Sequence, residues 1–444
     1  MKIIFFIILS FIFSERGDLI SYEFIGNKVV DDIQTQLNND FNSLAPEALY
    51  DVDLYAIIYE TIDQFGDVTI ASGLVSYPVD SPNAHPIYTF QHGTEIRRNG
   101  APSMNGFNSL VLWLSTRGYI FVESDFLGLG ISEMLHPYHL KDVTASTVID
   151  MLIASKQFCD NFVNVQYNDQ LYLAGYSEGG YATMAAVKEI EENYSNEISI
   201  TASFPMAGAY DLSGTMVDLM LLEEPYPDPY YLPYFVLSYI EKYSMGEVED
   251  FFLPEYAEIL PELFNGDFSG GYINSFLPDI PIHMMKPDVV EEFSNNESYI
   301  FRQYLEQNDL WNWSPINPMY LFHGMADESV PVENTIITYD HFIANGSTSV
   351  YSELLPESYG GHSDAALYCL LIAYDISENS KVFSSKGDIN SDQIINVLDI
   401  ILIVNYIIDD ITVSNFNNWL MDFNSDTIVN VLDIIGLLNL IIEN

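Results

Sequence analysis

The sequence predicts an α/β fold with a mostly parallel sheet covered by helices on both faces, followed by a small all-α domain. Short apolar runs of β-forming residues alternate with segments of helical spacing between residues 85 and 376, as parallel sheets require. About a hundred residues at 212–315 interrupt this alternation, and the end of the chain contains an internal repeat. We therefore expect one domain over 15–377 with an insertion at 212–315, a linker at 378–386 and a second domain over 387–444.

The first element is an apolar N-terminal segment. Lys2 precedes a largely apolar run from Ile3 to Phe13, which has the length of a signal peptide and is shorter than the roughly 20 residues that span a bilayer. We expect a signal peptide over residues 1–14 and a protein that is secreted or held at the cell surface. An uncleaved membrane anchor is the alternative. No later stretch predicts a transmembrane segment.

Antiparallel strands are expected next. Residues 21–26 predict a short strand, and residues 27–44 predict a helix. The segments at 54–63 and 68–78 are rich in β-forming residues and flank the turn Gln64–Asp67, a pattern typical of a β-hairpin. This hairpin should form an antiparallel edge of the sheet.

The parallel part of the sheet should follow the hairpin. Strands are predicted at 85–93, 118–124, 170–175, 198–206 and 317–324, and helices at 109–116, 143–158, 178–192 and 363–374. The interrupting segment at 212–315 is rich in aromatic residues and proline. It falls between two successive strands, so we expect a helical cap whose underside lines an apolar pocket. A purely structural insertion is the alternative.

A candidate nucleophile lies in the sequence Gly175–Tyr176–Ser177–Glu178–Gly179, which matches G-x-S-x-G. Such a serine occupies a strained turn between strand and helix, where neighbouring side chains would clash, and its hydroxyl projects from the turn. The apolar residues before this motif and the helix-forming residues after it are the context that the turn needs. We therefore predict that Ser177 is a nucleophile.

A serine hydroxyl needs a base, which an acid must orient. His362 follows two glycines in a predicted loop and precedes a helix, a position with no evident packing role. It is the candidate base. His323 and His341 are weaker candidates, because the first ends a strand and the second lies in a predicted helix.

The acid and the oxyanion donors are predicted from their positions after strands. Asp327 follows the strand at 317–324 and is the candidate acid, with Glu328 and Asp340 as rivals. The two backbone N–H groups of an oxyanion hole are expected from Glu178, which follows the nucleophile, and from Thr94, in the loop after an earlier strand.

These motifs resemble a known family of capped α/β-hydrolases. The segments QHGT at 91–94, SDFLGLG at 124–130, GYSEGG at 175–180 and HGMADESVP at 323–331 are similar to those of secreted esterases and lipases of the secretory-lipase type. These enzymes are distant relatives of prolyl-oligopeptidase catalytic domains. The resemblance covers about residues 20 to 376. It implies a triad of Ser177, Asp327 and His362 that hydrolyses carboxylic esters without a cofactor.

The composition excludes one class of partner. The chain has 64 acidic and 14 basic residues, for a formal net charge of −50, so few cations are available to neutralise phosphates and nucleic acid is not an expected partner. Only Cys159 and Cys369 are present. Both a single disulfide bond and two buried free thiols are compatible with an exported protein.

The C-terminal repeat predicts two calcium sites. The segments starting at Asp388 and Asp422 each contain D-x-N-x-D-x-x-x-N-x-x-D, which supplies oxygen ligands at loop positions suited to Ca²⁺. The side-chain ligands expected are Asp388, Asn390, Asp392, Asn396 and Asp399 in the first loop, and Asp422, Asn424, Asp426, Asn430 and Asp433 in the second. Ile394 and Ile428 would each add a backbone carbonyl. The role of the two ions would be structural.

This repeat resembles a type I dockerin, a module that binds cohesin domains. Position 6 of each loop carries Gln393 or Thr427 where glycine is usual, and a side chain in a left-handed turn costs on the order of 1 kcal/mol. Positions 10 and 11 are Val–Leu in both copies, where polar pairs assist cohesin binding. A cohesin-like partner and an end domain without a partner are both open.

Taken together, the sequence predicts a secreted serine hydrolase that cleaves carboxylic esters. A lipase and an esterase acting on acylated polysaccharide are equally compatible with it. A serine peptidase of the prolyl-oligopeptidase type is the first alternative. The second is a non-catalytic scaffold protein attached through its dockerin-like module, against which the intact order of Ser177, Asp327 and His362 argues.

Overall fold

The computed structural model describes residues 16–163, 165–409 and 415–443, so the predicted signal peptide at 1–14 lies outside the described residues. Ten strands form one mixed sheet in the order β1-β2-β3-β5-β4-β6-β7-β8-β9, with β10 paired to β4. The strands are β1 (Leu19–Lys28), β2 (Val52–Ile62), β3 (Val68–Pro78), β4 (Asn83–Gln91), β5 (Ile120–Ser124), β6 (Tyr167–Tyr176), β7 (Ala202–Met206), β8 (Met319–Gly324), β9 (Val350–Leu355) and β10 (Ser384–Ser385).

The sheet has an antiparallel and a parallel part. The predicted hairpin pairs β2 with β3 from Val52–Pro78 to Ile62–Val68. β1 adds to its outer side, and β3 pairs antiparallel with β5. From β5 through β4, β6, β7 and β8 to β9 all pairs are parallel. The antiparallel edge is thus one strand wider than the predicted hairpin.

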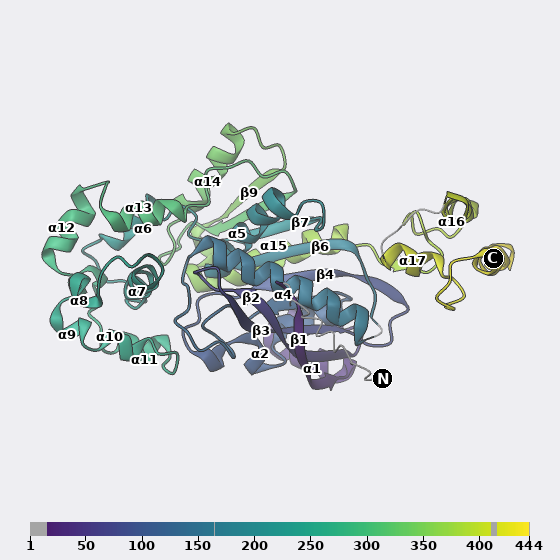
Figure 1. Cartoon of the computed structure of the whole chain (residues 1–444), viewed down its shortest axis with the longest axis horizontal. Coiled ribbons are helices and arrows are strands. Elements are labelled where there is room, and N and C mark those ends of the chain that lie inside the picture. Colours follow the sequence, from purple (N-terminus) through teal and green to yellow (C-terminus); the bar gives the residue numbers. More distant parts are fainter. Residues whose placement is uncertain (1–15, 164, 410–414, 444) are drawn as a thin grey trace, which may run out of the picture.

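Helices cover both faces of the sheet, as the sequence predicts (Figure 1). One core contains α4 (Lys141–Asn161), α5 (Glu178–Glu189) and α14 (Glu333–Ala344). The other core contains α1 (Val30–Phe41), α3 (Ser109–Thr116) and α15 (His362–Ser380). Because both faces are covered, all five residues of β5 and of β7 are buried, as is typical of central parallel strands.

The segment between β7 and β8 is helical and lies at one end of the molecule (Figure 1). It contains α6 (Thr215–Met220), α7 (Tyr231–Tyr243), α8 (Val248–Phe251), α9 (Pro254–Ala257), α10 (Leu260–Leu263), α11 (Gly270–Asn274), α12 (Pro287–Asn295) and α13 (Ile300–Gln307). We call this segment the cap. α7 is its central helix, since Leu232 to Tyr239 are all buried. The short helix α2 (Pro102–Asn105) lies outside the cap.

The C-terminal unit, residues 387–443, packs at the opposite end of the sheet from the cap (Figure 1). It contains α16 (Val397–Asp409), α17 (Asn415–Met421) and α18 (Val431–Glu443). Phe416 and Leu420 of α17 pack on Ala84, near the amino end of β4. The unit is therefore remote from the carboxyl ends of the parallel strands.

Residues 378–386, expected as a linker, form hydrogen bonds with the large domain. The first three complete α15, and Ser384–Ser385 form β10 against the start of β4. Between them, the N–H of Val382 donates to Gln170 Oε1 at 2.7 Å, and its carbonyl accepts from Asn168 at 2.8 Å. This segment therefore ties the C-terminal unit to β4 and β6.

Two further expectations concern membranes and cysteines. Within the described ranges, no helix combines the length and apolarity needed to cross a bilayer. Cys159 and Cys369 are both buried and both free, because they lie in different cores on opposite faces of the sheet. Of the two alternatives for the cysteines, the structure has the two buried thiols.

Candidate active site

Ser177 lies at the turn between β6 and α5, as the sequence predicts. Its backbone angles are φ 63° and ψ −124°, a conformation that costs a non-glycine residue about 1–3 kcal/mol. The neighbouring glycines make this turn possible. A Cβ atom at Gly179 would collide with the carbonyl oxygen of Gln91, and one at Gly175 would collide with the carbonyl oxygen of Gly179. The G-x-S-x-G motif is thus explained by close backbone approach.

The structure brings Ser177, His362 and Asp327 together at the carboxyl ends of β6, β8 and β9. His362 Nε2 lies 2.9 Å from Ser177 Oγ, and His362 Nδ1 lies 2.5 Å from Asp327 Oδ2. The carboxylate of Asp327 has no exposed surface, and burial alone would raise its pKa. Hydrogen bonds from His323 and His362 outweigh burial and hold the pKa of Asp327 well below its usual range. Asp327 is therefore ionised over the pH range in which His362 can serve as a base.

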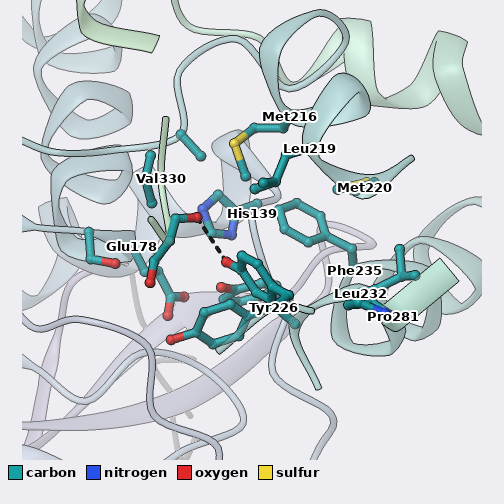
Figure 2. Close-up of a pocket in the computed structure, with 15 residues that line it drawn as sticks. His139, Glu178, Met216, Leu219, Met220, Tyr226, Leu232, Phe235, Pro281 and Val330 are labelled. Atoms are coloured by element: carbon teal, nitrogen blue, oxygen red, sulfur yellow. Dashed lines mark hydrogen bonds between the residues drawn. The ribbon is translucent and has the colours of Figure 1, made fainter. Parts of the chain in front are cut away.

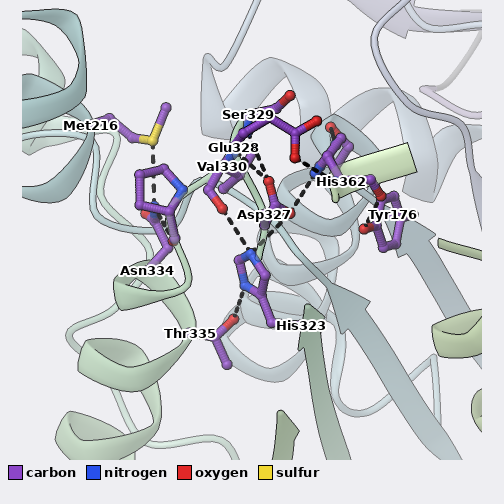
Figure 3. Close-up of polar contacts among 12 residues, drawn as sticks. Tyr176, Met216, His323, Asp327, Glu328, Ser329, Val330, Asn334, Thr335 and His362 are labelled. Atoms are coloured by element: carbon purple, nitrogen blue, oxygen red, sulfur yellow. Dashed lines mark hydrogen bonds and ion pairs between the residues drawn. The ribbon is translucent and has the colours of Figure 1, made fainter. Parts of the chain in front are cut away.

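His323 lies on the other side of Asp327 (Figure 3). The sequence makes it a weaker candidate for the base, but it is fully buried and its Nε2 lies 3.2 Å from Asp327 Oδ2. The same nitrogen lies 2.9 Å from the carbonyl oxygen of Val330, and Nδ1 lies 2.8 Å from Thr335 Oγ1. Since the Nε2–H is shared between Val330 and Asp327, Thr335 donates to Nδ1. His323 thus supports the acid. The sequence gives no signal for this contact, because a spacing of four predicts one only within a helix and His323 lies in β8.

The backbone of His362 is held from two sides. Tyr176 Oη donates to the carbonyl oxygen of His362 at 2.6 Å, and the backbone N–H of His362 donates to Glu328 Oε2 at 3.0 Å. The Tyr176 ring lies 5.0 Å from the imidazole. Glu328, a rival for the acid, therefore contacts the main chain of His362, while Asp327 contacts its ring. His341 and Asp340, the other rivals, lie in α14.

The predicted oxyanion donors both lie near Ser177. Glu178 is the first residue of α5, so its N–H is one of the donors that a helix leaves without an intrahelical acceptor. Thr94 lines the same cleft as Ser177. A Cβ atom at its neighbour Gly93 would lie 3.8 Å from the Cβ atom of Ser177. The loop after β4 therefore approaches the nucleophile closely.

Several solved structures share this arrangement of strands and helices. A putative hydrolase from Legionella pneumophila matches with a TM-score of 0.75 and 29% identity, over 81% of this chain and 97% of that chain. The rice cell wall degrading esterase LipA from Xanthomonas oryzae matches with a TM-score of 0.72 and 27% identity, over 82% of this chain and 98% of that chain. The fold is that of the α/β-hydrolases. Candida antarctica lipase A shares this fold alone, with a TM-score of 0.61 and 16% identity over 82% of each chain.

No protein-family model matches the chain, and no curated protein matches it. The structural relatives are therefore the comparisons that bear on function. Since those above 25% identity are a putative hydrolase and an esterase, they support a hydrolase. The α/β-hydrolase fold positions its functional side chains at the carboxyl ends of the strands.

Two cavities meet at Ser177. The first lies beneath the cap and is mostly apolar (Figure 2). Its walls are Ala209, Met216, Leu219, Met220, Leu232, Phe235, Pro281 and Val330, with Tyr138, His139, Glu178, Tyr226, Tyr231 and Ser329 as the more polar groups. The second is an open cleft lined largely by polar residues, among them Thr94, Glu123 and His362. Ser177 and Tyr231 line both cavities.

A buried pair of side chains lies behind the nucleophile. His136 Nε2 lies 2.5 Å from Glu178 Oε1, and both side chains are 3% exposed. His136 Nδ1 donates to the carbonyl oxygen of Leu127 at 2.6 Å. Burial alone would raise the pKa of Glu178, but the charge of His136 and its hydrogen bond lower it. The sequence gives no signal for this pair, since His136 and Glu178 are 42 residues apart.

His139, which lines the apolar cavity, should make stability depend on pH. Burial lowers its pKa to about 4, well below that of an exposed histidine. Because the unfolded chain then binds a proton that the folded chain does not, the free energy of unfolding should fall as pH drops from 6.5 to 4. The contribution of His139 is roughly 3 kcal/mol. We expect His139→Phe to reduce the fall by about that amount, as measured by urea unfolding at both pH values.

The exposed histidine His283 is the matched control for this prediction. Its side chain is 51% exposed and pairs with the exposed Glu223 at 2.7 Å. Because exposed ion pairs contribute little to stability, His283→Phe should change the difference between the two pH values far less than His139→Phe does. A fall of equal size in wild type and His139→Phe would show that His139 is not the group responsible. His85 is expected to contribute in the same direction, because burial also lowers its pKa to about 4.

The two C-terminal loops repeat one another in hydrogen bonding. Asp388 accepts from the N–H groups of residues 392 and 393, and Asp422 from those of 426 and 427. Asp399 and Asp433, both without exposed surface, each accept from two or three N–H groups of their own loop. Position 6 is left-handed in both loops, with φ 66° at Gln393 and 71° at Thr427, as predicted.

The carboxylate and amide oxygens of these loops suit a hard cation, although the acidic side chains do not converge on one point. Among the described residues, no three side chains of His, Cys, Asp or Glu lie close enough to hold a metal ion. In each loop the amide of the first asparagine donates to the middle aspartate, as Asn390 does to Asp392. Burial and the neighbouring Asp399 and Asp392 raise the pKa of Asp388, a repulsion that a bound cation would relieve. Carboxylate and amide oxygens are the ligands that Ca²⁺ prefers.

Proposed function

We propose that this protein is a serine hydrolase of carboxylic esters, with Ser177 as nucleophile, His362 as general base and Asp327 as the acid that orients it. The observation that carries the proposal is the chain of hydrogen bonds from Ser177 Oγ to His362 and on to Asp327, with distances of 2.9 and 2.5 Å. Its occurrence in an α/β-hydrolase fold similar to an esterase at 27% identity supports the same reading.

In the first half of the reaction, Ser177 Oγ bonds to the carbonyl carbon of the ester while its proton passes to His362 Nε2. The carbonyl oxygen becomes an oxyanion, which the N–H groups of Glu178 and Thr94 stabilise. The oxyanion then re-forms the carbonyl, the bond to the alcohol oxygen breaks, and His362 gives its proton to that oxygen. The products of this half are the free alcohol and an acyl group on Ser177.

In the second half, water attacks the acyl group while His362 Nε2 takes one of its protons. The second oxyanion collapses, the bond to Ser177 Oγ breaks, and the proton returns to that oxygen. The carboxylic acid leaves and the starting state is restored. The ionised carboxylate of Asp327 stabilises the imidazolium in both halves.

The proposal includes export and two bound calcium ions. Export rests on the predicted signal peptide at residues 1–14, and an extracellular ester would suit the comparison with a rice cell wall degrading esterase. Calcium rests on the duplicated aspartate and asparagine pattern and on the matching loop hydrogen bonds described above. The ions would hold the C-terminal unit folded and take no part in the ester chemistry.

The proposal also includes a protein partner for the C-terminal unit. α16 and α18 pack on each other through Ile403 and Leu437. Their other faces keep large apolar side chains in solvent, namely Val397, Leu398, Ile401, Val431, Leu432 and Ile435, which are 48–60% exposed. Apolar patches on soluble proteins mark interaction sites. A cohesin-like domain with an apolar face is the partner that fits the dockerin-like repeat.

The proposed ester hydrolysis predicts a covalent intermediate on Ser177. The full-length protein, purified with calcium, should hydrolyse p-nitrophenyl esters and release a burst of nitrophenol equal to the enzyme concentration. After acid quenching, mass spectrometry should find the acyl group on the peptide that contains Ser177. Hydrolysis of peptide substrates alone would support the peptidase alternative. A folded protein that cleaves neither and acquires no acyl group would contradict the proposal and favour the non-catalytic scaffold.

A further inference from the structure

The two cavities at Ser177 are not equivalent for catalysis, because His362 lines only one of them. The apolar cavity beneath the cap does not include His362, whereas the open cleft includes His362 and its neighbours Ser363 and Ala366. In the proposed reaction His362 must deliver its proton to the oxygen of the departing alcohol. The alcohol half of the ester therefore has to lie on the side of the open cleft, and the acyl half on the side of the cap.

The open cleft is polar where the other cavity is apolar. It is lined by Glu95, Asn105, Asn108, Glu123 and Ser363, and it encloses about 1020 Å³, part of it open to solvent. The side chain of Asn105 uses its amide nitrogen for three carbonyl groups of its own turn, so its oxygen remains as an acceptor. Asn108 uses its oxygen for the N–H of Val111, so its nitrogen remains as a donor. An alkyl alcohol could form hydrogen bonds with few of the polar groups in this cleft.

Glu123 is a buried residue of the cleft with a polar atom that a ligand could hydrogen-bond. It lies on β5, it is 3% exposed, and its Oε2 is buried without a hydrogen-bond partner. Burial, with a smaller contribution from the nearby Asp125, raises the pKa of Glu123 well above its usual range. Burial thus favours the protonated form of this carboxyl group, which can both donate and accept a hydrogen bond. A buried polar atom without a partner destabilises the folded protein, and a hydroxyl group of a ligand would supply the missing hydrogen bond.

We propose that the open cleft binds the alcohol half of the substrate as a polyhydroxylated alcohol of the sugar type, with Glu123 as its buried specificity residue. Tyr176 and Tyr231 line the same cleft, and aromatic side chains provide apolar surface on which a sugar ring can pack. The apolar cavity beneath the cap takes the acyl chain. This inference rests on the proposed ester hydrolysis and assigns its two cavities to the two halves of the ester.

The test compares three octanoate esters that differ only in the alcohol: a methyl glucoside, glycerol and ethanol. For wild type, kcat/KM for the glucoside ester should exceed that for ethyl octanoate by about tenfold or more, since paired polar groups discriminate strongly against a substrate that lacks them. Glycerol would be the favoured alcohol if a short polyol is the source of the hydroxyl groups, and a clear preference for it over the glucoside would overturn the assignment to a sugar.

Substitutions at Glu123 then test the named residue. Glu123→Leu should lower the ratio of the glucoside ester to the ethyl ester about tenfold, whereas Glu123→Gln, which is neutral and still donates and accepts, should largely retain it. A ratio that stays at the wild-type value in a folded Glu123→Leu protein would overturn the role of Glu123. Thermal unfolding of each variant checks that it is folded.

A variant at the rim keeps the proposal testable if Glu123→Leu does not fold. Asn105 is exposed, and Asn105→Trp should narrow the cleft and lower the same ratio. Asn161→Trp is the matched control, because Asn161 is also exposed and lies at the end of α4, outside the cleft. If wild type cleaves all three esters equally well and neither tryptophan variant changes the ratio, the cleft assignment fails while ester hydrolysis stands. If wild type cleaves none and Ser177 is not acylated, the proposed function itself fails.

Discussion

Replacing Asp327 by asparagine should lower kcat for ester hydrolysis by about 10⁴. The carboxylate accepts from His362 Nδ1 at 2.5 Å and so fixes the tautomer whose Nε2 can take the proton of Ser177. An asparagine amide can donate to Nδ1 instead, which leaves the proton on Nε2 and removes the base. The measurement is kcat for p-nitrophenyl butyrate, with Ser177→Ala as the floor and thermal unfolding as the check on folding.

Glu328→Gln is the matched control for this substitution. Glu328 is the next residue along the chain and its Oε2 accepts from the backbone N–H of His362 at 3.0 Å. A glutamine keeps an acceptor there, so kcat should change by no more than about threefold. A loss in Glu328→Gln as large as that in Asp327→Asn would mean that Glu328, a rival for the acid on sequence grounds, serves as the acid.

The sheet and the turn at Ser177 could be predicted because each depends on neighbours in the sequence. The helix predicted at 109–116 is α3 at the same bounds, and the hairpin at 54–78 is β2 and β3. The cap helices could only be predicted as a group. α7, for example, is buried all round over Leu232 to Tyr239, so it has no polar face from which a helical period could be recognised.

The residues of the candidate site also divide into those that could be predicted from the sequence and those that could not. Ser177, Asp327 and His362 could be proposed from a motif and from positions after strands. His136 and Tyr176 could not, since their partners lie far away in the sequence: His136 meets Glu178 across 42 residues, and Tyr176 meets His362 across 186. Glu123 gave no signal, because an acidic residue inside a strand predicts nothing about a cleft until the fold is known.

The segment at 378–386 shows the same limit for domain boundaries. Its composition predicts a linker, whereas its main chain pairs with β4 and contacts β6. Backbone hydrogen bonds do not depend on side-chain type, so composition carries little information about them. The two Asp-rich loops were predictable for the opposite reason, because a repeated pattern of oxygen-bearing side chains is a property of the sequence itself.

Calcium should stabilise the C-terminal unit through two separate sites. Asp388 and Asp422 hold equivalent places in loops with equivalent hydrogen bonds, and a cation bound only by the folded state adds about 2.7 kcal/mol at a hundredfold excess over its dissociation constant. Calorimetric titration of the metal-free, full-length protein should find two ions per chain. Each of Asp388→Ala and Asp422→Ala should lower this to one, and the double variant to none.

Ester hydrolysis reports on the large domain alone, so it distinguishes an effect of calcium on the C-terminal unit from an effect on the whole protein. The C-terminal unit packs near the amino end of β4, whereas Ser177 lies at the carboxyl end of β6. Removal of calcium should therefore lower the unfolding temperature of the C-terminal unit, followed as a separate transition by calorimetry. It should leave kcat for p-nitrophenyl butyrate within about twofold at 25 °C. Two ions that remain bound in the double variant would place the sites elsewhere. A protein that binds no calcium and unfolds identically with chelator would show that these loops fold without metal.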